Sequence, residues 1–409
     1  EKNEKLFGYG GAGTYSDGKL HLTPALSHDK LIDMVGFEKY QKYLDSVDEI
    51  FVSQGVDAEI YPKDDKHVNS FIEECAKKDI KLINRKLRHV GSDKLPAVIQ
   101  NFENYLRSKN VDLFEDEEIV DLIIRNNEIK GIKGISLDDV IEADNVLIAP
   151  GRGNSRWLQG LAEKYNLGSS YEKILVGARV EFPSEVLKKF SDEMYESVFL
   201  VKTHTYGDVV RTFCVCPSGY VATETYDGYV CANGHSNHEK LSGNSNFALL
   251  SEVRLTEPFG NTLEYGQFIA NAFAKCSGNK PILQRLYDLK SGRRSTWERI
   301  AECPISPSLK NVTPGDISLV MPGRILQNLL EAIHKLESVL PGLDSSSTLL
   351  YAPEIKMNST RIKTDNNLQT VVSGLYVAGD GAGVSGSITG AAASALIVAD
   401  GIKDRLTGR

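Results

Sequence analysis

Residues 374–383 read GLYVAGDGAG, which combines a short apolar strand with a glycine-rich turn. A helix is predicted directly after this turn, over 387–404, because small and apolar residues dominate there. Gly381, Gly383 and Gly386 match G-x-G-x-x-G, but the chain ends too soon after them for the second strand of a dinucleotide-binding β-α-β unit. The stretch therefore indicates a helix N-terminus whose N–H groups hold hydroxyl groups and a negative charge. Tight strand–helix packing without a ligand is the alternative.

A second match to G-x-G-x-x-G, at Gly8, Gly10 and Gly13, lies near the amino terminus. Only two apolar residues precede it, and residues 14–18 continue as a polar loop, so the strand and helix that the motif requires are missing. The segment is better interpreted as a loop whose backbone approaches a flat ligand closely, because glycine lacks Cβ. A glycine-rich turn without a ligand is the other interpretation.

The composition is that of an ordinary globular protein. Of 409 residues, 41% are hydrophobic and 25% are charged, which argues against disorder and fibrous structure. The net charge of −8 has the wrong sign for a protein whose main partner is nucleic acid or an anionic membrane. A small-molecule substrate is therefore expected. The longest apolar stretch, 391–399, is too short for a membrane span, so none is expected.

The six cysteines are too few for a disulfide scaffold and contain no C-x-x-C pair, so we expect a cytoplasmic protein. Cys214 and Cys216 lie two apart on a predicted strand, where their side chains would point the same way. Core packing of these thiols is the main interpretation, and contact with a ligand is the other. Cys231, His235 and His238 suggest zinc, but their spacing fits no standard site, so no metal is expected.

Hydrophobic periodicity predicts the remaining elements. Helices are expected over 31–54, 64–78, 91–110, 185–196, 263–274 and 325–340, the third with Ser92 as its N-cap. Strands are expected over 111–114, 118–125, 128–134, 140–149, 209–215, 220–225 and 374–380.

Several of these segments resemble a known family. Residues 374–383 are similar to the C-terminal flavin motif of FAD-dependent oxidoreductases with the glutathione-reductase type of FAD fold. Residues 145–151, NVLIAPG, resemble the "ATG" motif of the same proteins, with Pro150 in place of the usual Thr. More narrowly, the blocks 10–20, 89–95, 211–217 and 312–316 resemble, in order, a bacterial group of FAD-dependent dehydrogenases.

The resemblance implies an α/β and α+β fold in which an incomplete FAD/NAD(P)-binding Rossmann-like domain carries an inserted, mostly antiparallel β substrate domain. We assign 1–29, 84–165 and 346–409 to the FAD-binding domain, 30–83 to a helical insertion, and 166–345 to the substrate domain. In that family the chain opens with a β-α-β unit that binds the ADP half of FAD, whereas this sequence starts after it. We therefore expect a missing unit of roughly 30 residues or more.

The implied function is FAD-dependent oxidation or reduction of an unidentified substrate, with hydride transfer through flavin N5. The implied cofactor contacts are Gly11, Ala12, Gly13, Thr14, Val120, Pro150, Gly151, Gly379, Asp380, Gly381, Ala382, Gly383, Ser387 and Ile388. Among these, Asp380 would hold the ribityl chain. The alternative is a non-catalytic binding or scaffold protein that keeps the fold without FAD, favoured by the absent fingerprint and by Pro150.

Substrate contacts are expected from the β-rich domain. The candidates are Arg211, Cys214, Cys216, Asn233 and His235. Arg211 and His235 would anchor an anionic or carbonyl group, although Arg211 could equally pair with a surface carboxylate. No catalytic residue is assigned. Without a C-x-x-C pair, we expect an external electron donor or acceptor, a nicotinamide or quinone-like molecule, in place of an internal disulfide relay.

Overall fold

The chain folds into two compact units, each assembled from separate segments. The first contains Glu1–Ala58, Lys94–Glu172 and Asn358–Arg409, and the second contains Glu59–Asp93 and Lys173–Met357. The computed structural model describes residues 8–26, 28–135, 140–226, 228–236, 241–256, 260–357 and 361–408. Residues 30–83, expected as one helical insertion, are thus divided between the two units.

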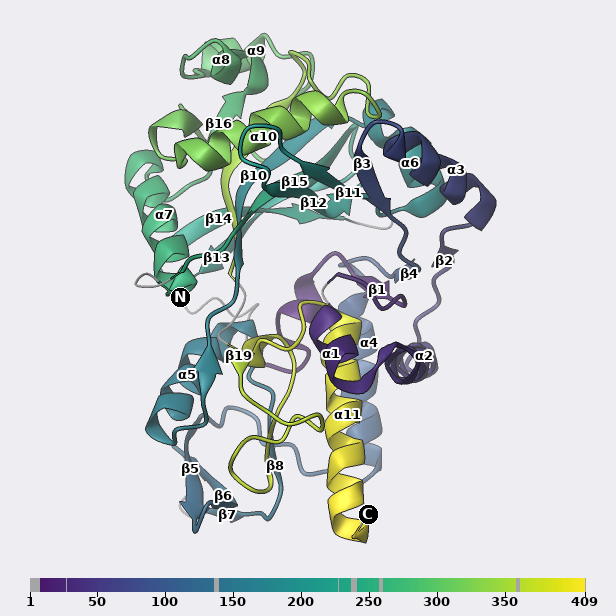
Figure 1. Ribbon diagram of the computed structural model, residues 1–409, viewed down its shortest axis with the longest axis vertical. Coiled ribbons are helices and arrows are strands. Elements are labelled where there is room, and N and C mark those ends of the chain that lie inside the picture. Colours follow the sequence, from purple (N-terminus) through teal and green to yellow (C-terminus); the bar gives the residue numbers. More distant parts are fainter. Residues whose placement is uncertain are drawn as a thin grey trace. The chain divides into compact units, whose positions relative to one another are not determined.

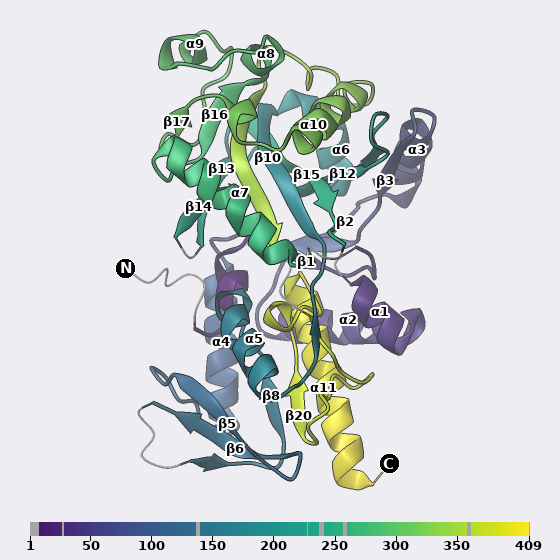
Figure 2. The ribbon, with the colours of Figure 1, turned by 60° about the vertical axis from the view of Figure 1, so that its left-hand side comes forward.

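In the first unit, the predicted strand and helix around the glycine-rich turn are both confirmed. Strand β20 (Leu375–Val377) pairs in parallel with β8 (Val146–Ile148), and α11 (Ile388–Thr407) follows the turn. Figure 2 shows this pair apart from the sheet of β5 (Ile119–Arg125) and β6 (Glu128–Gly134). The unit's other elements are η2 (Gly11–Tyr15), β1 (Lys19–His21), α1 (Asp29–Val35), α2 (Phe37–Ser53), α4 (Leu95–Ser108), β7 (Ile141–Glu142), η3 (Arg152–Asn154), α5 (Ser155–Lys164), β9 (Ser169–Ser170), β19 (Arg361–Ile362) and η5 (Asp380–Ala382).

The ends of α11 show how local chemistry fixes a helix. The Ser387 hydroxyl oxygen accepts a hydrogen bond from the Gly390 N–H at 3.0 Å, and so satisfies one of the unpaired donors of the first turn. At the other end Gly408 adopts a φ of 68°, the left-handed conformation that glycine tolerates best. The N-cap predicted for α4 is wrong, because that helix begins at Leu95 and Ser92 lies outside it.

The second unit is built around a sheet in the order β17-β16-β18-β10-β15-β12-β11-β3, in which only β16 and β17 pair in parallel. The expected mostly antiparallel domain is therefore confirmed. The elements are β2 (Ile60–Tyr61), α3 (Asp65–Ala76), β3 (Ile80–Ile83), β4 (Leu87–His89), β10 (Ile174–Pro183), α6 (Glu185–Met194), β11 (Val198–Lys202), β12 (Val209–Cys216), β13 (Tyr220–Tyr226), β14 (Tyr229–His235), β15 (Asn244–Val253), α7 (Thr262–Ser277), β16 (Ile282–Arg285), α8 (Leu286–Lys290), α9 (Trp297–Ala301), β17 (Thr313–Pro314), η4 (Ile317–Leu319), α10 (Gly323–Leu336) and β18 (Leu349–Met357).

Strand β10 explains why the two faces of this sheet differ. Val176, Ala178 and Val180 alternate into the main apolar core, which α10 covers (Figure 1). Because side chains alternate along a strand, Arg179 and Glu181 point to the opposite face. Both charged residues are fully buried there. One face is therefore an ordinary hydrophobic core, and the other carries buried charges that need partners.

The structure also differs from the sequence expectations. Strands β3 and β18 are not among the predicted elements, although β18 lies inside the large sheet. The strand predicted over 111–114 is wrong, because that segment is irregular. Among the described residues, none of the helices combines the length and the apolar character needed to cross a membrane.

Candidate functional site

Three short turns pack against one another in the first unit. They are η2, which contains Gly11, Ala12, Gly13 and Thr14; η3, directly after Pro150 and Gly151; and η5, which contains Asp380, Gly381 and Ala382. The structure thus brings together most of the cofactor contacts that the sequence predicts. Ser387 and Ile388 follow at the start of α11, and a Cβ added at Gly13 would lie 3.4 Å from Ile388 Cγ1. Val120 lies instead on β5, in the other sheet.

The glycines of these turns have two different roles. A Cβ at Gly381 would lie 2.2 Å from the Gly151 carbonyl oxygen, so Gly381 is required for close backbone packing. At Gly11 and Gly151, in contrast, nothing lies within 4 Å of the position of an added Cβ. Their φ values are 50° and 66°, which favour glycine. The turns therefore offer uncovered backbone that a flat ligand could approach.

The carboxylate of Asp380 already has a strong partner. Arg152 Nε donates to Asp380 Oδ2 at 2.8 Å, and both side chains are about one-quarter exposed. Arg152 directly follows the turn that resembles the "ATG" motif, so its position in the sequence could have suggested this pair. A ribityl hydroxyl would have to share Asp380 with this guanidinium.

Lys30 is a second basic residue at these turns that sequence reasoning missed. Its Nζ donates to the Gly383 carbonyl oxygen at 2.7 Å and lies 3.1 Å from Glu172 Oε1. Burial lowers the pKa of Lys30, while the carboxylate of Glu172 acts in the opposite direction. Nothing in its local sequence indicates this contact, because Gly383 lies far along the chain.

A buried histidine supports the start of α11. The Nε2 of His28 lies 3.2 Å from the Ser387 hydroxyl, and its Nδ1 lies 2.5 Å from the Tyr40 hydroxyl. His28 is fully buried, and burial raises the pKa of Tyr40. Ser387, predicted to contact the cofactor, thus caps its own helix and bonds to this imidazole.

In the second unit, Arg179 organises three of the predicted substrate residues. It donates through Nη1 to the Cys214 carbonyl oxygen at 2.7 Å and through Nη2 to Asn233 Oδ1 at 3.4 Å. Its Nε donates to Glu354 Oε2 at 2.9 Å, and Arg179 and Glu354 are both completely buried. Cys216 Sγ donates to the Cys214 carbonyl at 3.4 Å. The sequence did not identify Arg179, because its partners lie on other strands.

Lys356 extends this cluster to a second carboxylate. Its Nζ lies 3.2 Å from Glu354 Oε1 and 3.3 Å from Glu224 Oε2, and it donates to Asn233 Oδ1 at 3.3 Å. Asn233 Nδ2 in turn donates to Glu224 Oε2 at 3.0 Å. The two cations of Arg179 and Lys356 are therefore balanced by two carboxylates, as buried charges require.

The remaining candidates lie around this cluster. The Arg211 guanidinium stacks 4.9 Å from the centre of the Phe213 ring, and Lys356 Nζ lies 5.9 Å from the same ring. His235 Nδ1 lies 3.4 Å from the Ser92 hydroxyl. The structure thus gathers Cys214, Cys216 and Asn233 around one guanidinium, and gives Arg211 and His235 separate contacts.

The regular strand assumed for Cys214 and Cys216 is wrong. Strand β12 shifts register between Phe213 and Cys216, and Cys214 has a φ of 48°. Cys216 is buried and Cys214 is partly exposed. Burial also raises the pKa of Cys231 to about 12. His238, the last member of the Cys-His pattern, lies outside the described residues.

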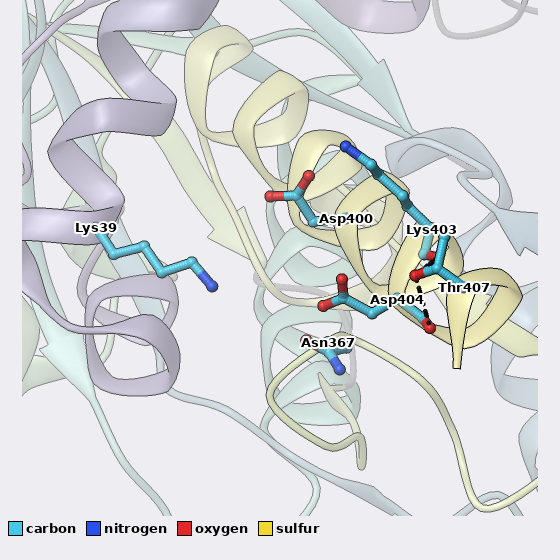
Figure 3. A pocket seen from close by; sticks show the side chains of 6 residues that line it. All are labelled: Lys39, Asn367, Asp400, Lys403, Asp404 and Thr407. Atoms are coloured by element: carbon cyan, nitrogen blue, oxygen red, sulfur yellow. Dashed lines mark hydrogen bonds between the residues drawn. The ribbon is translucent and has the colours of Figure 1, made fainter. Parts of the chain in front are cut away.

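A separate hollow of about 410 Å³ lies in the first unit between α2 and the end of α11 (Figure 3). Lys39, Asn367, Asp400, Lys403, Asp404 and Thr407 line it. Asp400 accepts a hydrogen bond from the Tyr43 hydroxyl at 2.6 Å. Thr407 donates to the Lys403 carbonyl oxygen of its own helix at 2.9 Å. These contacts belong to helix packing and indicate no chemistry.

Comparison with known proteins connects the second unit with FAD. Residues 173–357 match the family model "FAD-dependent protein, C-terminal domain-like". The match has the same bounds as the longer segment of the second unit, Lys173–Met357. It therefore covers the large sheet except for β3, together with the cluster around Arg179.

Other similarities are more distant. A protein of Clostridium beijerinckii (strain ATCC 51743 / NCIMB 8052), called only "Uncharacterized protein", is 23% identical over 423 residues, which cover 98% of this chain and 70% of the relative. Glycine oxidase from Bacillus cereus ATCC 14579 aligns at 11% identity and a TM-score of 0.34, over 97% of this chain and 87% of that structure. L-proline dehydrogenase from P. horikoshii aligns at 13% identity and a TM-score of 0.36, over 94% and 81%. These TM-scores do not establish a common fold.

Proposed function

We propose that the protein is an FAD-dependent oxidoreductase with the glutathione-reductase type of FAD fold. The observation that carries the proposal is the match of 173–357 to the FAD-dependent family model. The strand, glycine-rich turn and helix at 375–407 support it independently, because this arrangement suits the binding of hydroxyl groups and of negative charge at a helix N-terminus.

The turns of the first unit fit such a cofactor. Gly11 and Gly151 present backbone with open space at their Cβ positions, which suits contact with a flat ring system. Asp380, supported by Arg152, would hold the ribityl hydroxyls. The other contacts proposed at these turns are Ala12, Gly13, Thr14, Pro150, Gly379, Gly381, Ala382, Gly383, Ser387 and Ile388. Bound FAD would supply hydride transfer at N5.

We further propose that the substrate is a small molecule bound by the second unit. The cluster of Arg179, Lys356, Glu224 and Glu354 is neutral overall, so it supports positioning of Asn233 and Cys214 more readily than capture of an anion. Arg211 and His235 remain the candidates for contact with a charged or carbonyl group. The electron partner would be a nicotinamide or quinone-like molecule.

FAD binding by the full natural chain is the decisive experiment. The purified protein should show flavin absorbance, and FAD at 100 times its Kd should stabilise it by about 2.7 kcal/mol in a thermal shift assay. Asp380→Asn should weaken binding roughly 10- to 100-fold, since a hydrogen bond to a charged group contributes about 1.5–3 kcal/mol. Asp404→Asn, an exposed position on α11, is the matched control. A folded, colourless protein that ignores FAD would refute the proposal.

The absence of a disulfide relay can be tested by reductive titration. No C-x-x-C pair occurs in the sequence. Anaerobic dithionite titration of the FAD-loaded protein should therefore consume one two-electron equivalent per flavin. Uptake of a second equivalent that disappears in Cys214→Ser would show that these thiols take part in electron transfer.

A binding or scaffold protein without FAD is the second candidate. The Arg152–Asp380 ion pair favours it, because the guanidinium occupies the carboxylate that would hold the ribityl chain. Under this alternative, FAD would cause no thermal shift, and Asp380→Asn would change only the stability of the first unit.

A further inference from the structure

The chain makes an unusual turn in the second unit directly after α6. Tyr195 has φ 58° and ψ −58°, and the Glu196 N–H donates to the Met194 carbonyl oxygen at 2.6 Å. This is the rarer, strained form of the γ-turn. A non-glycine residue in such a conformation costs of order 1–3 kcal/mol and persists only where the surroundings enforce it.

Contacts on both sides of Tyr195, one of them buried, hold this turn. Glu196 is buried and lies 3.3 Å from Arg85 Nη1, which is also buried. On the other side, the Glu193 carbonyl oxygen accepts a hydrogen bond from the Lys63 N–H at 3.1 Å. Arg85 lies just before β4, so the ion pair also ties Tyr195 to the strand that carries His89.

The turn directs the Tyr195 hydroxyl to a base. It lies 2.7 Å from His89 Nε2 and 2.8 Å from the Ser236 hydroxyl. The centroids of the His89 and Tyr195 rings lie 4.1 Å apart, and the centroid of the Tyr61 ring lies 5.4 Å from that of Tyr195. His89 and Ser236 are buried, whereas Tyr195 is partly exposed. Tyr195 is therefore the member of the group with solvent-exposed surface.

A second layer holds these groups in place. The Ser236 carbonyl oxygen accepts hydrogen bonds from the Ser92 N–H at 3.4 Å and from its hydroxyl at 3.3 Å. His89 and Ser92 belong to the block 89–95, which resembles a bacterial group of FAD-dependent dehydrogenases. Ser236 directly follows His235, a candidate for substrate contact. The proposed flavin contacts use none of these residues.

We propose that Tyr195 is a proton-transfer residue and that His89 is the base that receives its proton. When an electrophile or a proton donor approaches the phenol oxygen, the phenolic O–H bond breaks, the proton passes to His89 Nε2, and the oxygen forms the new bond. In the reaction of the proposed flavoenzyme, on which this part rests, the new bond is to a proton that the substrate gives up.

The activated phenol can be tested without FAD or substrate, using N-acetylimidazole on the full chain. The acetyl–nitrogen bond of the reagent breaks, an ester forms at the Tyr195 oxygen, and the phenol proton leaves through His89 to the released imidazole. Tyr287 is 54% exposed and serves as the reference tyrosine. Peptide mass spectrometry should show Tyr195 acetylated faster than Tyr287 despite its lower exposure, since general base catalysis contributes about 10²-fold or more.

Two variants distinguish a role of His89 as a base from a purely structural role. His89→Gln should slow acetylation of Tyr195 by about 10²-fold and leave Tyr287 unchanged. Ser236→Ala removes the other hydrogen bond but keeps the base, so it should retain most of the rate. Equal losses in both variants, or a Tyr195 that reacts more slowly than Tyr287 in the wild-type protein, would overturn the proposal. If FAD does not bind but Tyr195 still shows the expected acetylation rates, only the proposed function is refuted, and the activated phenol of Tyr195 is retained.

Discussion

The buried ion pair of Arg179 and Glu354 makes the most direct test of how the second unit is stabilised. Replacing Glu354 by Gln keeps the shape and one hydrogen-bond acceptor, but removes the carboxylate that Arg179 and Lys356 share. Removing one partner of a fully buried pair costs about 3–5 kcal/mol, because a charge remains buried without compensation. Since Gln can still accept from the guanidinium, we expect a loss of about 3 kcal/mol, or roughly 6–12 °C in Tm.

Urea unfolding followed by fluorescence measures this loss in the correct unit. Trp297 lies on α9 of the second unit, so Trp157→Phe leaves it as the one tryptophan of the chain. Glu74→Gln is the matched control: its carboxylate pairs with Lys189 at 2.5 Å, but both side chains are exposed. That substitution should cost less than about 1 kcal/mol. If Glu354→Gln is no more destabilising than this control, the assignment of Arg179–Glu354 as a buried, stabilising pair is wrong.

Three further predictions concern other parts of the chain. Gly381→Ala should lower the free energy of unfolding of the first unit by about 1–3 kcal/mol in a denaturation assay, because the added methyl group overlaps with backbone. Gly160→Ala lies in a helix with open space around it, so it should raise the free energy of unfolding by about 0.4–1 kcal/mol in the same assay. Iodoacetamide at pH 8 should label exposed Cys276 but not Cys231, whose pKa burial raises to about 12; labelling of both in the folded protein would contradict this. Burial would raise the pKa of Asp288, but its hydrogen bonds to arginine and serine side chains lower it to about 2. The stability that this carboxylate contributes should be lost as the pH falls from about 4 to 2, and Asp288→Asn should make the fall in stability over that range shallower.

Local sequence patterns were sufficient where one segment alone determines the structure. Helix α10 follows from apolar residues such as Ile325, Leu329 and Ile333 on one face, and all three are buried. The strand and helix around Gly381 follow in the same way, from an apolar run, glycines and small helix-forming residues. In both segments the signal lies in one continuous stretch of the chain and does not depend on a distant partner.

The rest could not be predicted, because it depends on contacts between distant segments. Arg179 interrupts an apolar strand and becomes stable there only because Glu354, on a strand far along the chain, neutralises it. Cys214 shows the same limit, since the bulge that turns it out of the regular strand is set by its pairing with β15. The proton-transfer residue Tyr195 has no motif of its own, and its importance appears only when Glu196 and His89 are placed beside it.

The parallel pairing of β8 with β20 has a consequence for biosynthesis. More than two hundred residues separate these two strands, and the whole second segment of the second unit is translated between them. At about 5–20 residues per second, β8 leaves the ribosome roughly 10–45 s before its partner exists. During that interval the large sheet can assemble, while one edge of β8 stays exposed and open to pairing with other chains. A chain released between residues 357 and 375 would therefore contain every segment of the β-rich unit but lack the partner strand of β8.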